Sequence, residues 1–361
     1  MLKVAINGFG RIGRLALRVG LKKYADKIQF VAINTSGRVD TAGWAHLFEY
    51  DTVYGKYQGE VGVEGDPSSP SMNSGQVGSG QVMVVDGIKI PVLAELEPKK
   101  LPWEKLEVDL VLECTGKFRK VEEADDHLEA GAKRVLLSAP PKVDSTSSPQ
   151  ADSTSSPQAD SGIYVRGIND DKYNGEKIFS NASCTTNCVA PVMQVMMSEF
   201  GVKKAIMTTI HAVTSSQRMV DNSHKDLRRA RAGCFNLIPT TTGAAKTTAK
   251  VINGLDGIFD GIAIRVPILT GSLTDFTFLI DKKTTVEEVN RVIREASGDK
   301  LKGVLGVTDK PVVSSDIVGC EYSSLVDMGM TRVVDGDMVK ILSWYDNEWG
   351  YVVRMMELAL L

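Results

Sequence analysis

The chain has 361 residues, of which 43% are hydrophobic and 24% are charged, and a formal net charge of −3. This balance is typical of an ordinary globular protein, excludes a disordered or fibrous chain, and gives no basic field for nucleic acid or an anionic membrane. The length favours two domains, because single hydrophobic cores stop growing beyond about 250–300 residues.

The first 140 residues alternate short apolar runs with a helical pattern, which predicts a parallel α/β sheet. We expect buried strands at residues 4–6, 30–33, 108–114 and 135–137. Residues 12–20 carry apolar side chains at helical spacing and complete a βαβ unit between the first two strands. Ligands of such sheets bind at the carboxyl ends of the strands, so the residues after each strand are candidates for a binding site.

Two segments interrupt this pattern. Residues 62–82 are rich in Gly, Ser and Pro, and residues 144–159 repeat the octapeptide DSTSSPQA in tandem. Such segments cannot bury enough apolar surface to offset chain ordering, so we expect mobile surface loops. A tolerated loop expansion is the simpler interpretation of the repeat, and a phosphorylation or partner-binding tail is the alternative.

The character of the sequence changes near residue 183. A predicted helix over residues 185–200 is followed by runs with β character at residues 205–209, 261–266, 274–280 and 338–344. This mixture predicts an α+β second domain with a mainly antiparallel sheet.

Gly8, Gly10 and Gly13 form a GxGxxG pattern that follows the first predicted strand and opens a helix. Glycines in this pattern permit a tight turn and the close approach of a pyrophosphate, and the free N–H groups of the helix start attract anions. Within a complete βαβ unit the pattern predicts a dinucleotide site, with a glycine-rich turn that binds nothing as the alternative.

The acidic residue expected about 20 positions after the glycines is missing. Asn34, Thr35, Ser36, Gly37 and Arg38 stand there instead. A carboxylate would repel the 2′-phosphate of NADP, whereas hydroxyls, N–H groups and a guanidinium would bind it. NADP use and a merely solvated Arg38 both fit this segment.

Cys184 lies where a loop becomes the helix of residues 185–200, within the run SNASCTTN. The helix dipole and local N–H groups should lower its pKa and favour a nucleophilic thiolate. Cys188, one turn later, suits neither zinc nor a disulfide, because the sequence has no second Cys or His pair at suitable spacing and an i, i+4 pair is near the limit of disulfide geometry. We therefore expect no metal.

His211 ends the β-like run that starts at residue 205 and is one of four histidines. It is a candidate base or ion-pair partner for Cys184, with a buried structural histidine as the alternative. His46, His127 and His224 lie in weaker contexts, among many polar neighbours.

Features of the whole chain indicate its compartment. Five scattered cysteines are too few for a disulfide framework, which favours a reducing environment. The first residues do not resemble a signal-peptide core, and no apolar run approaches the roughly 20 residues that span a bilayer. The sequence predicts a cytoplasmic protein.

Together these motifs resemble the phosphorylating (type I) glyceraldehyde-3-phosphate dehydrogenase family. The matching runs are INGFGRIGR, SNASCTTN, TTIHAVT, HKDLRRARA, IPTTTGAAK, IRVP and SWYDNEWGY. The resemblance that they mark extends over nearly the whole chain outside the two interrupted segments. The resemblance implies that Cys184 forms a thioester with glyceraldehyde 3-phosphate after His211 activates it through an ion pair and proton transfer. Hydride would pass to NAD or NADP, and inorganic phosphate would release 1,3-bisphosphoglycerate in a reversible reaction.

The resemblance also implies ligand contacts. The substrate phosphate would bind Thr214 and Arg265, the attacking phosphate would bind Ser183, Thr185, Thr242 and Gly243, and the nicotinamide carboxamide would bind Asn347. The other dinucleotide contacts would be Gly8, Phe9, Gly10, Arg11, Ile12, Gly13, Asn34, Thr35, Ser36, Arg38, Thr115, Gly116, Ser138 and Ser223.

Two departures from the usual NAD-type pattern favour NADP. Thr35 stands in place of the ribose-binding Asp, and Asn222-Ser223 replaces a Leu-Pro pair, as in the NADP-using photosynthetic branch. The basic residues 224–231 match the family's S-shaped loop at a subunit interface, so the resemblance implies a homotetramer and makes nucleic acid an unlikely partner. The alternatives are an erythrose-4-phosphate dehydrogenase and a non-enzymatic dinucleotide- or RNA-binding scaffold.

The expected architecture is a Rossmann-type doubly wound parallel sheet plus an α+β catalytic domain. The Rossmann domain would cover residues 1–182, with low-complexity loops at 62–82 and 143–161, and the catalytic domain would cover residues 183–346. A helix over residues 347–361 would return to the first domain.

Overall fold

The computed structural model describes residues 1–65, 81–142 and 161–361, which divide into two compact units. The first unit comprises Met1–Tyr164, Tyr173–Ala182 and Met355–Leu361, and the second comprises Val165–Lys172 and Ser183–Arg354. The boundaries expected from the sequence differ from these units at Val165–Lys172 and at residues 347–354, which group with the second unit. The octapeptide repeat at 144–159 lies outside the described residues.

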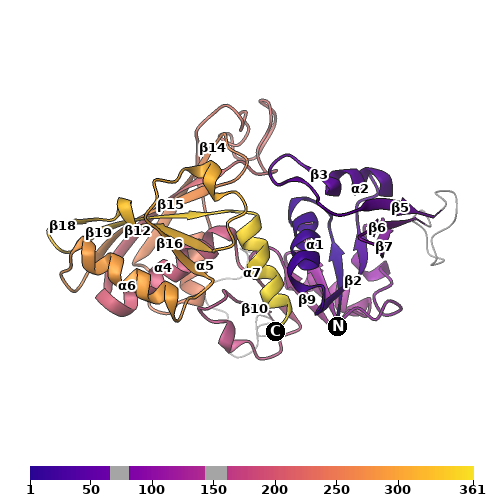
Figure 1. Ribbon diagram of the computed structural model, residues 1–361, viewed down its shortest axis with the longest axis horizontal. Helices are drawn as coiled ribbons and strands as arrows, with labels where there is room; N and C mark the ends of the chain where they lie inside the picture. Colours follow the sequence, from indigo (N-terminus) through magenta and orange to yellow (C-terminus); the bar gives the residue numbers. More distant parts are fainter. Residues whose placement is uncertain (66–80, 143–160) are drawn as a thin grey trace. The chain divides into compact units, whose positions relative to one another are not determined.

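The first unit is built on one large sheet. Its strands are β1 (Leu2–Asn7), β2 (Ile28–Asn34), β5 (Val61–Glu64), β6 (Val82–Val85), β7 (Ile88–Leu93), β8 (Leu110–Glu113), β9 (Arg134–Leu137), β10 (Ser161–Ile163) and β11 (Ile178–Ser180). Across the described residues they follow the order β10-β11-β9-β8-β1-β2-β7-β6-β5. Figure 1 labels β2, β7, β6 and β5 at one end of this order. The strands from β10 to β7 pair in parallel, which confirms the Rossmann-type sheet expected from the sequence.

Three helices of this unit follow β-strands in the chain: α1 (Arg11–Tyr24), α2 (Thr41–Glu49) and α3 (Val121–Glu129). Helix α1 buries Leu15, Ala16 and Val19 at the spacing that the sequence predicted, which places one apolar stripe in the core. Strands β3 (Tyr50–Asp51) and β4 (Gly55–Lys56) form a small separate hairpin after α2.

The prediction of a surface loop over residues 62–82 is wrong at both ends. Strands β5 and β6 pair antiparallel through Val61↔Val85 and Glu64↔Val82, and β6 pairs in turn with β7. Alternate residues of β6, Met83 and Val85, are buried just beyond the predicted segment, whereas residues 62–64 at its other end are exposed or half-buried. Residues 66–80 lie outside the described part of the chain.

The second unit contains the other large sheet. Its strands are β12 (Val202–Ala212), β13 (Ile238–Thr241), β14 (Phe259–Val266), β15 (Ser272–Ile280), β16 (Leu305–Thr308), β17 (Ser324–Asp327), β18 (Arg332–Val334) and β19 (Met338–Tyr345). The order is β13-β14-β12-β15-β19-β17-β16, with β18 beside β19. All its pairs are antiparallel except β12 with β14 and β16 with β17, so the mainly antiparallel sheet is confirmed.

Helices α4 (Cys184–Phe200), α5 (Ala244–Val251) and α6 (Val286–Gly298) complete the second unit, and α7 (Trp349–Ala359) ends the chain. Helix α4 packs on β12, β15, β17 and β19, and it buries twelve of its 17 residues. Among the described residues, we find no helix with the length and apolar character needed to cross a membrane.

Candidate active site

The candidate nucleophile is held by the start of α4. Ser183 is the N-cap residue, and its Oγ accepts a hydrogen bond from the backbone N–H of Thr186 at 3.0 Å. Just before it, Ala182 adopts a left-handed conformation (φ +54°), which turns the chain sharply into the helix. Cys184 is therefore the first residue of α4, as the sequence predicted.

Cys184 lies beside the candidate base. Its Sγ is 3.5 Å from Nε2 of His211, which is near the end of β12 and is buried. Arg265 on β14 is paired in register with His211, and its Nη1 contacts Nδ1 of the imidazole. Parallel pairing of β12 with β14 thus aligns the base with a guanidinium.

Two groups meet Nδ1 of His211. The carbonyl oxygen of Ala212, at 2.7 Å, calls for a ring hydrogen on Nδ1, and Nη1 of Arg265 contacts Nδ1 as well as donating to that carbonyl at 3.1 Å. In the tautomer with the hydrogen on Nδ1, Nε2 is the acceptor that faces the Cys184 thiol. Burial and the charge of Arg265 lower the pKa of His211 to about 3, so the ring is neutral near pH 7.

The pKa of the Cys184 thiol is shifted in the direction opposite to the one expected from the sequence. The sequence predicted a lowered pKa for Cys184, but burial raises the pKa of this thiol, and Arg265 and hydrogen bonds involving Thr185 oppose that rise without reversing it. Both shifts oppose the expected thiolate–imidazolium pair. In the neutral form of the pair, Nε2 of His211 can accept the thiol proton.

The buried Tyr345 connects α4, which carries Cys184, with β12, which carries His211. The Tyr345 hydroxyl on β19 is 3.0 Å from Oγ1 of Thr185 on α4 and 2.8 Å from Oγ1 of Thr209 on β12. Its ring meets the His211 ring edge to face, with centroids 6.0 Å apart. Burial raises the pKa of Tyr345, so the hydroxyl stays protonated and can donate to a threonine.

Cys188 has a different environment. It is fully buried, its Sγ contacts Thr274, Ser324 and the carbonyl of Ser343, and burial raises its pKa to about 12. All five cysteines are free. Among the residues described here, no group of three or more His, Cys, Asp or Glu side chains could hold a metal ion.

The candidate phosphate-binding residues divide into two groups. Ser183, Thr185 and Arg265 belong to the Cys184–His211 cluster through the contacts above. Thr214 follows β12 and its Oγ1 is 2.8 Å from Oγ of Ser216, whereas Thr242 and Gly243 form the start of α5, where Oγ1 of Thr242 accepts from the N–H of Ala244 at 3.2 Å.

In the first unit, two glycines of the glycine turn are closely packed and the third faces open space. Gly8 has φ +98°, and a Cβ atom there would lie 2.7 Å from the Thr115 nitrogen. A Cβ on Gly13 would lie 2.1 Å from the Gly8 oxygen, so that position requires glycine. Gly10, the N-cap of α1, faces open space, and no side chain of the described residues caps this helix. Its N–H groups are thus available to an anion such as a pyrophosphate.

Three other candidate residues, Phe9, Arg11 and Ile12, lie in the glycine turn and the first turn of α1. Phe9 is buried against Trp44 and Phe48. Arg11 forms an ion pair with Asp51, and Ile12 is half-buried in the first turn of α1.

The loop after β2 holds the residues expected at the adenosine ribose. Thr35 is buried, and its hydroxyl donates to the carbonyl of Leu93 at 3.1 Å and accepts from the N–H of Gly37 at 3.3 Å. Its hydroxyl therefore shapes the loop. Ser36 and Arg38 are exposed and offer a hydroxyl and a guanidinium to a ligand.

Two further loops carry candidate cofactor contacts. Thr115 and Gly116 follow β8, where Gly116 has φ +68°, and Ser138 follows β9 and donates its N–H to the carbonyl of Glu113 at 3.0 Å. Asn34 ends β2 and bonds to Asn7 and to the backbone of Glu95.

Two candidates belong to the second unit. Oδ1 of Asn347 accepts from the Ser272 hydroxyl at 2.7 Å and lies 3.2 Å from the Thr270 hydroxyl, so its Nδ2 remains the donor side of the amide. Ser223 is exposed directly before the basic loop of residues 224–231, and its carbonyl accepts from Arg218.

Sequence reasoning missed several buried polar residues. Tyr345, Glu113 and Trp103 were not candidates, and His127 was set aside for its polar neighbours. A carboxylate that ends a buried strand, as Glu113 does, was a signal available in the sequence. Tyr345 carried no such signal, because its partners are 160 and 136 residues away in the chain.

Comparison with known proteins agrees with this geometry. Residues 2–121 match the family model described as the NAD binding domain of glyceraldehyde 3-phosphate dehydrogenase, and residues 183–347 match the model of its C-terminal domain. Glyceraldehyde-3-phosphate dehydrogenase 2 of Streptomyces avermitilis is 46% identical, with 99% of this chain and 98% of that protein covered. The glyceraldehyde-3-phosphate dehydrogenase of Thermotoga maritima is also 46% identical, over 100% of this chain and 99% of its own. The chain belongs to the glyceraldehyde 3-phosphate dehydrogenase family.

Proposed function

We propose that this protein catalyses the phosphorylating, reversible oxidation of glyceraldehyde 3-phosphate to 1,3-bisphosphoglycerate. The observation that carries the proposal is the 3.5 Å contact between Cys184 Sγ and His211 Nε2 at the start of α4, in a chain that belongs to this family. A thiol beside a neutral imidazole is suited to attack an aldehyde carbon.

The first chemical step joins Cys184 to the substrate. Sγ forms a bond to the aldehyde carbon while its proton passes to Nε2 of His211, and the imidazolium returns a proton to the new oxyanion. The Cys184 N–H at the start of α4 and the protonated His211 stabilise that oxygen. The product of this step is a hemithioacetal.

His211 then removes the hydroxyl proton of the hemithioacetal as the carbon becomes the acyl carbon of a thioester. A bound nicotinamide dinucleotide supplies the acceptor for the hydride that leaves this carbon. Inorganic phosphate attacks the thioester carbon, the C–S bond breaks, and Cys184 leaves as the thiolate that His211 reprotonates. Covalent attachment keeps the oxidation energy in an activated acyl group.

Two anion sites serve these steps. Thr214 and Arg265 bind the substrate phosphate, and Ser183, Thr185, Thr242 and Gly243 bind the attacking phosphate. Hydroxyls, backbone N–H groups and a guanidinium are strong phosphate donors, and their positions at Cys184 and at the start of α5 support these roles.

The cofactor is NADP or NAD. Gly10 leaves space for the pyrophosphate at the uncapped start of α1, where Gly8 and Gly13 permit the tight turn, and Asn347 presents its amide N–H₂ to the carboxamide. Exposed Ser36 and Arg38 support binding of a 2′-phosphate, and Ser223 is a further donor. Thr35 favours NADP because it stands in place of a carboxylate that would repel the 2′-phosphate. Its own hydroxyl is already bonded to the carbonyl of Leu93.

An erythrose-4-phosphate dehydrogenase is the alternative. Both enzymes would use the same nucleophile, but that enzyme releases a free acid, so phosphate-dependent turnover separates the two. A dinucleotide- or RNA-binding scaffold without catalysis would leave the Cys184–His211 contact unexplained. Five free cysteines support a reducing compartment, and we propose the cytoplasm.

Replacing the nucleophile tests the covalent mechanism. Cys184→Ser should lower kcat by at least about a thousandfold, because a serine hydroxyl is a much weaker nucleophile beside a neutral histidine. The matched control is Cys188→Ala, which should keep kcat within about fivefold, since Cys188 is buried away from solvent. Near-normal turnover of Cys184→Ser would contradict the mechanism.

Comparing the two cofactors tests the 2′-phosphate site. The native protein should have a higher kcat/KM for NADP than for NAD. Arg38→Ala should lower kcat/KM for NADP by roughly tenfold, from a charge-assisted bond of about 1.5–3 kcal/mol that solvent exposure weakens, and leave NAD unchanged. Adding Thr35→Asp should shift the preference further toward NAD. A native preference for NAD that neither variant changes would refute the assignment.

We also propose a homotetramer assembled through the second unit. Large apolar side chains are exposed there on strands β12, β14 and β19 and on the basic loop, including Ile206, Ile262, Met338 and Leu227. Such patches mark protein interfaces. Light scattering should give about four times the 39.1 kDa chain mass, and Ile206→Asp with Ile262→Asp should lower it. Ile88→Asp, on β7 of the first unit, is the control, and a monomeric native protein would exclude this assembly.

A further inference from the structure

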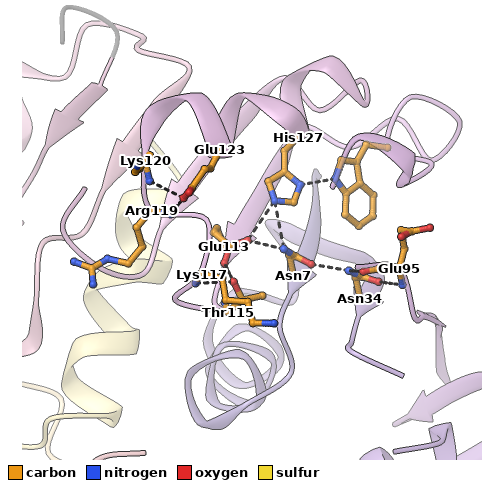
Figure 2. Close-up of polar contacts among 11 residues, drawn as sticks. Asn7, Asn34, Glu95, Glu113, Thr115, Lys117, Arg119, Lys120, Glu123 and His127 are labelled. Atoms are coloured by element: carbon orange, nitrogen blue, oxygen red, sulfur yellow. Dashed lines mark hydrogen bonds and ion pairs between the residues drawn. The ribbon is translucent and has the colours of Figure 1, made fainter. Parts of the chain in front are cut away.

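A buried carboxylate lies at the carboxyl edge of the first sheet. Glu113 ends β8 and is only 2% exposed. Its Oε2 accepts from Nδ2 of Asn7 at 2.5 Å and lies 3.2 Å from Nε2 of His127, and its Oε1 accepts from the N–H of Thr115 at 2.8 Å and from the Thr115 hydroxyl (Figure 2). A carboxylate has about four acceptor sites, so these four donors saturate it.

The charge state of His127 follows from its other neighbour. The indole N–H of Trp103 is 3.0 Å from Nδ1 of His127, and an indole N–H can only donate. Nδ1 is therefore an acceptor, and the ring hydrogen is on Nε2, which donates to Glu113 and also lies 3.3 Å from Nδ2 of Asn7, a second donor to the same carboxylate. If both ring nitrogens were protonated, the Nδ1–H group of His127 would face the indole N–H of Trp103, and neither could accept. Among the described residues, His127 is the one ionisable group within ion-pair distance of Glu113, and it is neutral.

This network spans the ends of three neighbouring strands. Asn34, Asn7 and Glu113 are paired in register on β2, β1 and β8, so their side chains lie on the same face of the sheet. Oδ1 of Asn7 accepts from Nδ2 of Asn34 at 2.7 Å, and Oδ1 of Asn34 accepts from the N–H of Glu95 at 2.9 Å. Figure 2 shows the chain of contacts from His127 to Glu95.

Each member of the network adjoins a loop that the proposed function uses. Asn7 precedes the glycine turn, Asn34 precedes the loop of Ser36 and Arg38, and Glu113 bonds twice to Thr115. Thr115 in turn contacts the turn directly, since a Cβ on Gly8 would lie 2.7 Å from its nitrogen. One carboxylate thus bonds directly to residues at two of these loops and reaches the third loop through Asn7 and Asn34.

We propose that Glu113, with His127 and Trp103 behind it, is a positioning residue that sets the three loops for dinucleotide binding. The inference rests on the proposed function. Glu113 does not touch the ligand, because its acceptor sites are already filled. Burying an anion without a cation costs stability, and only a carboxylate of this length accepts from all four donors at once. A glutamine would direct its N–H₂ group at donors that the carboxylate accepts.

Glu113→Gln tests this role. The Kd values for NAD and NADP, measured by calorimetry, should each rise at least tenfold. The KM for glyceraldehyde 3-phosphate and the rate of Cys184 alkylation without cofactor should stay unchanged, because those groups belong to the second unit. The matched control is Glu176→Gln, at the amino end of β11, where the carboxylate bonds to Tyr164 and Asn174. It should leave both Kd values unchanged.

A second variant keeps the test decisive if Glu113→Gln does not fold. Trp103→Phe retains the Glu113 carboxylate and an aromatic ring but removes the N–H donor that fixes the His127 tautomer. The Kd values for NAD and NADP should therefore rise severalfold. The kcat at saturating cofactor should stay unchanged. Native-like Kd values in the folded variant overturn the positioning role alone. A native protein that binds neither NAD nor NADP overturns both this role and the proposed function.

Discussion

The contact between the first residue of α4 and the end of β12 is the constraint on which the proposed chemistry depends. The backbone of Cys184 cannot shift relative to His211 without movement of α4, whose residues Val189, Ala190 and Met193 are fully buried. The Tyr345 hydroxyl bonds to threonines on both elements and so fixes their separation. Close packing of interiors resists such movement, which keeps the nucleophile and the base in reach of each other.

Arg265 influences both members of this pair. Its charge favours the thiolate of Cys184 and disfavours protonation of His211, which keeps Nε2 open to receive the thiol proton. An anion bound to Arg265 would offset that charge and raise the pKa of His211. Binding of the substrate phosphate at Arg265 would therefore strengthen the base at the moment when it is needed.

Most of the architecture could be predicted from the sequence. Periodic apolar residues located β1, β2, α1 and β9 to within a few residues, because burial alone determines these elements. Composition misled at residues 62–82, where the polar segment hides two strand ends that pair with each other and with β7. Pairing partners distant in the chain leave no local signal.

The same limit applies to the site. Cys184 and the glycine turn were visible because a helix start and a tight turn require particular residues in sequence order. The neutral state of His211 was not, since it depends on burial and on Arg265, which lies 54 residues away. Glu113, His127 and Trp103 also act through contacts that only folding creates, and the fold brings them to the edge where three strands end.

The central claim is that Cys184 carries the acyl group. The direct measurement is peptide mass spectrometry of the native protein, quenched in acid after mixing with glyceraldehyde 3-phosphate and NADP in the absence of phosphate. We predict a phosphoglyceroyl adduct on the peptide that contains Cys184, and its loss when phosphate is added before the quench. Reduction of the dinucleotide without any adduct, or with the adduct on Cys188, Cys234 or another cysteine, would contradict the account.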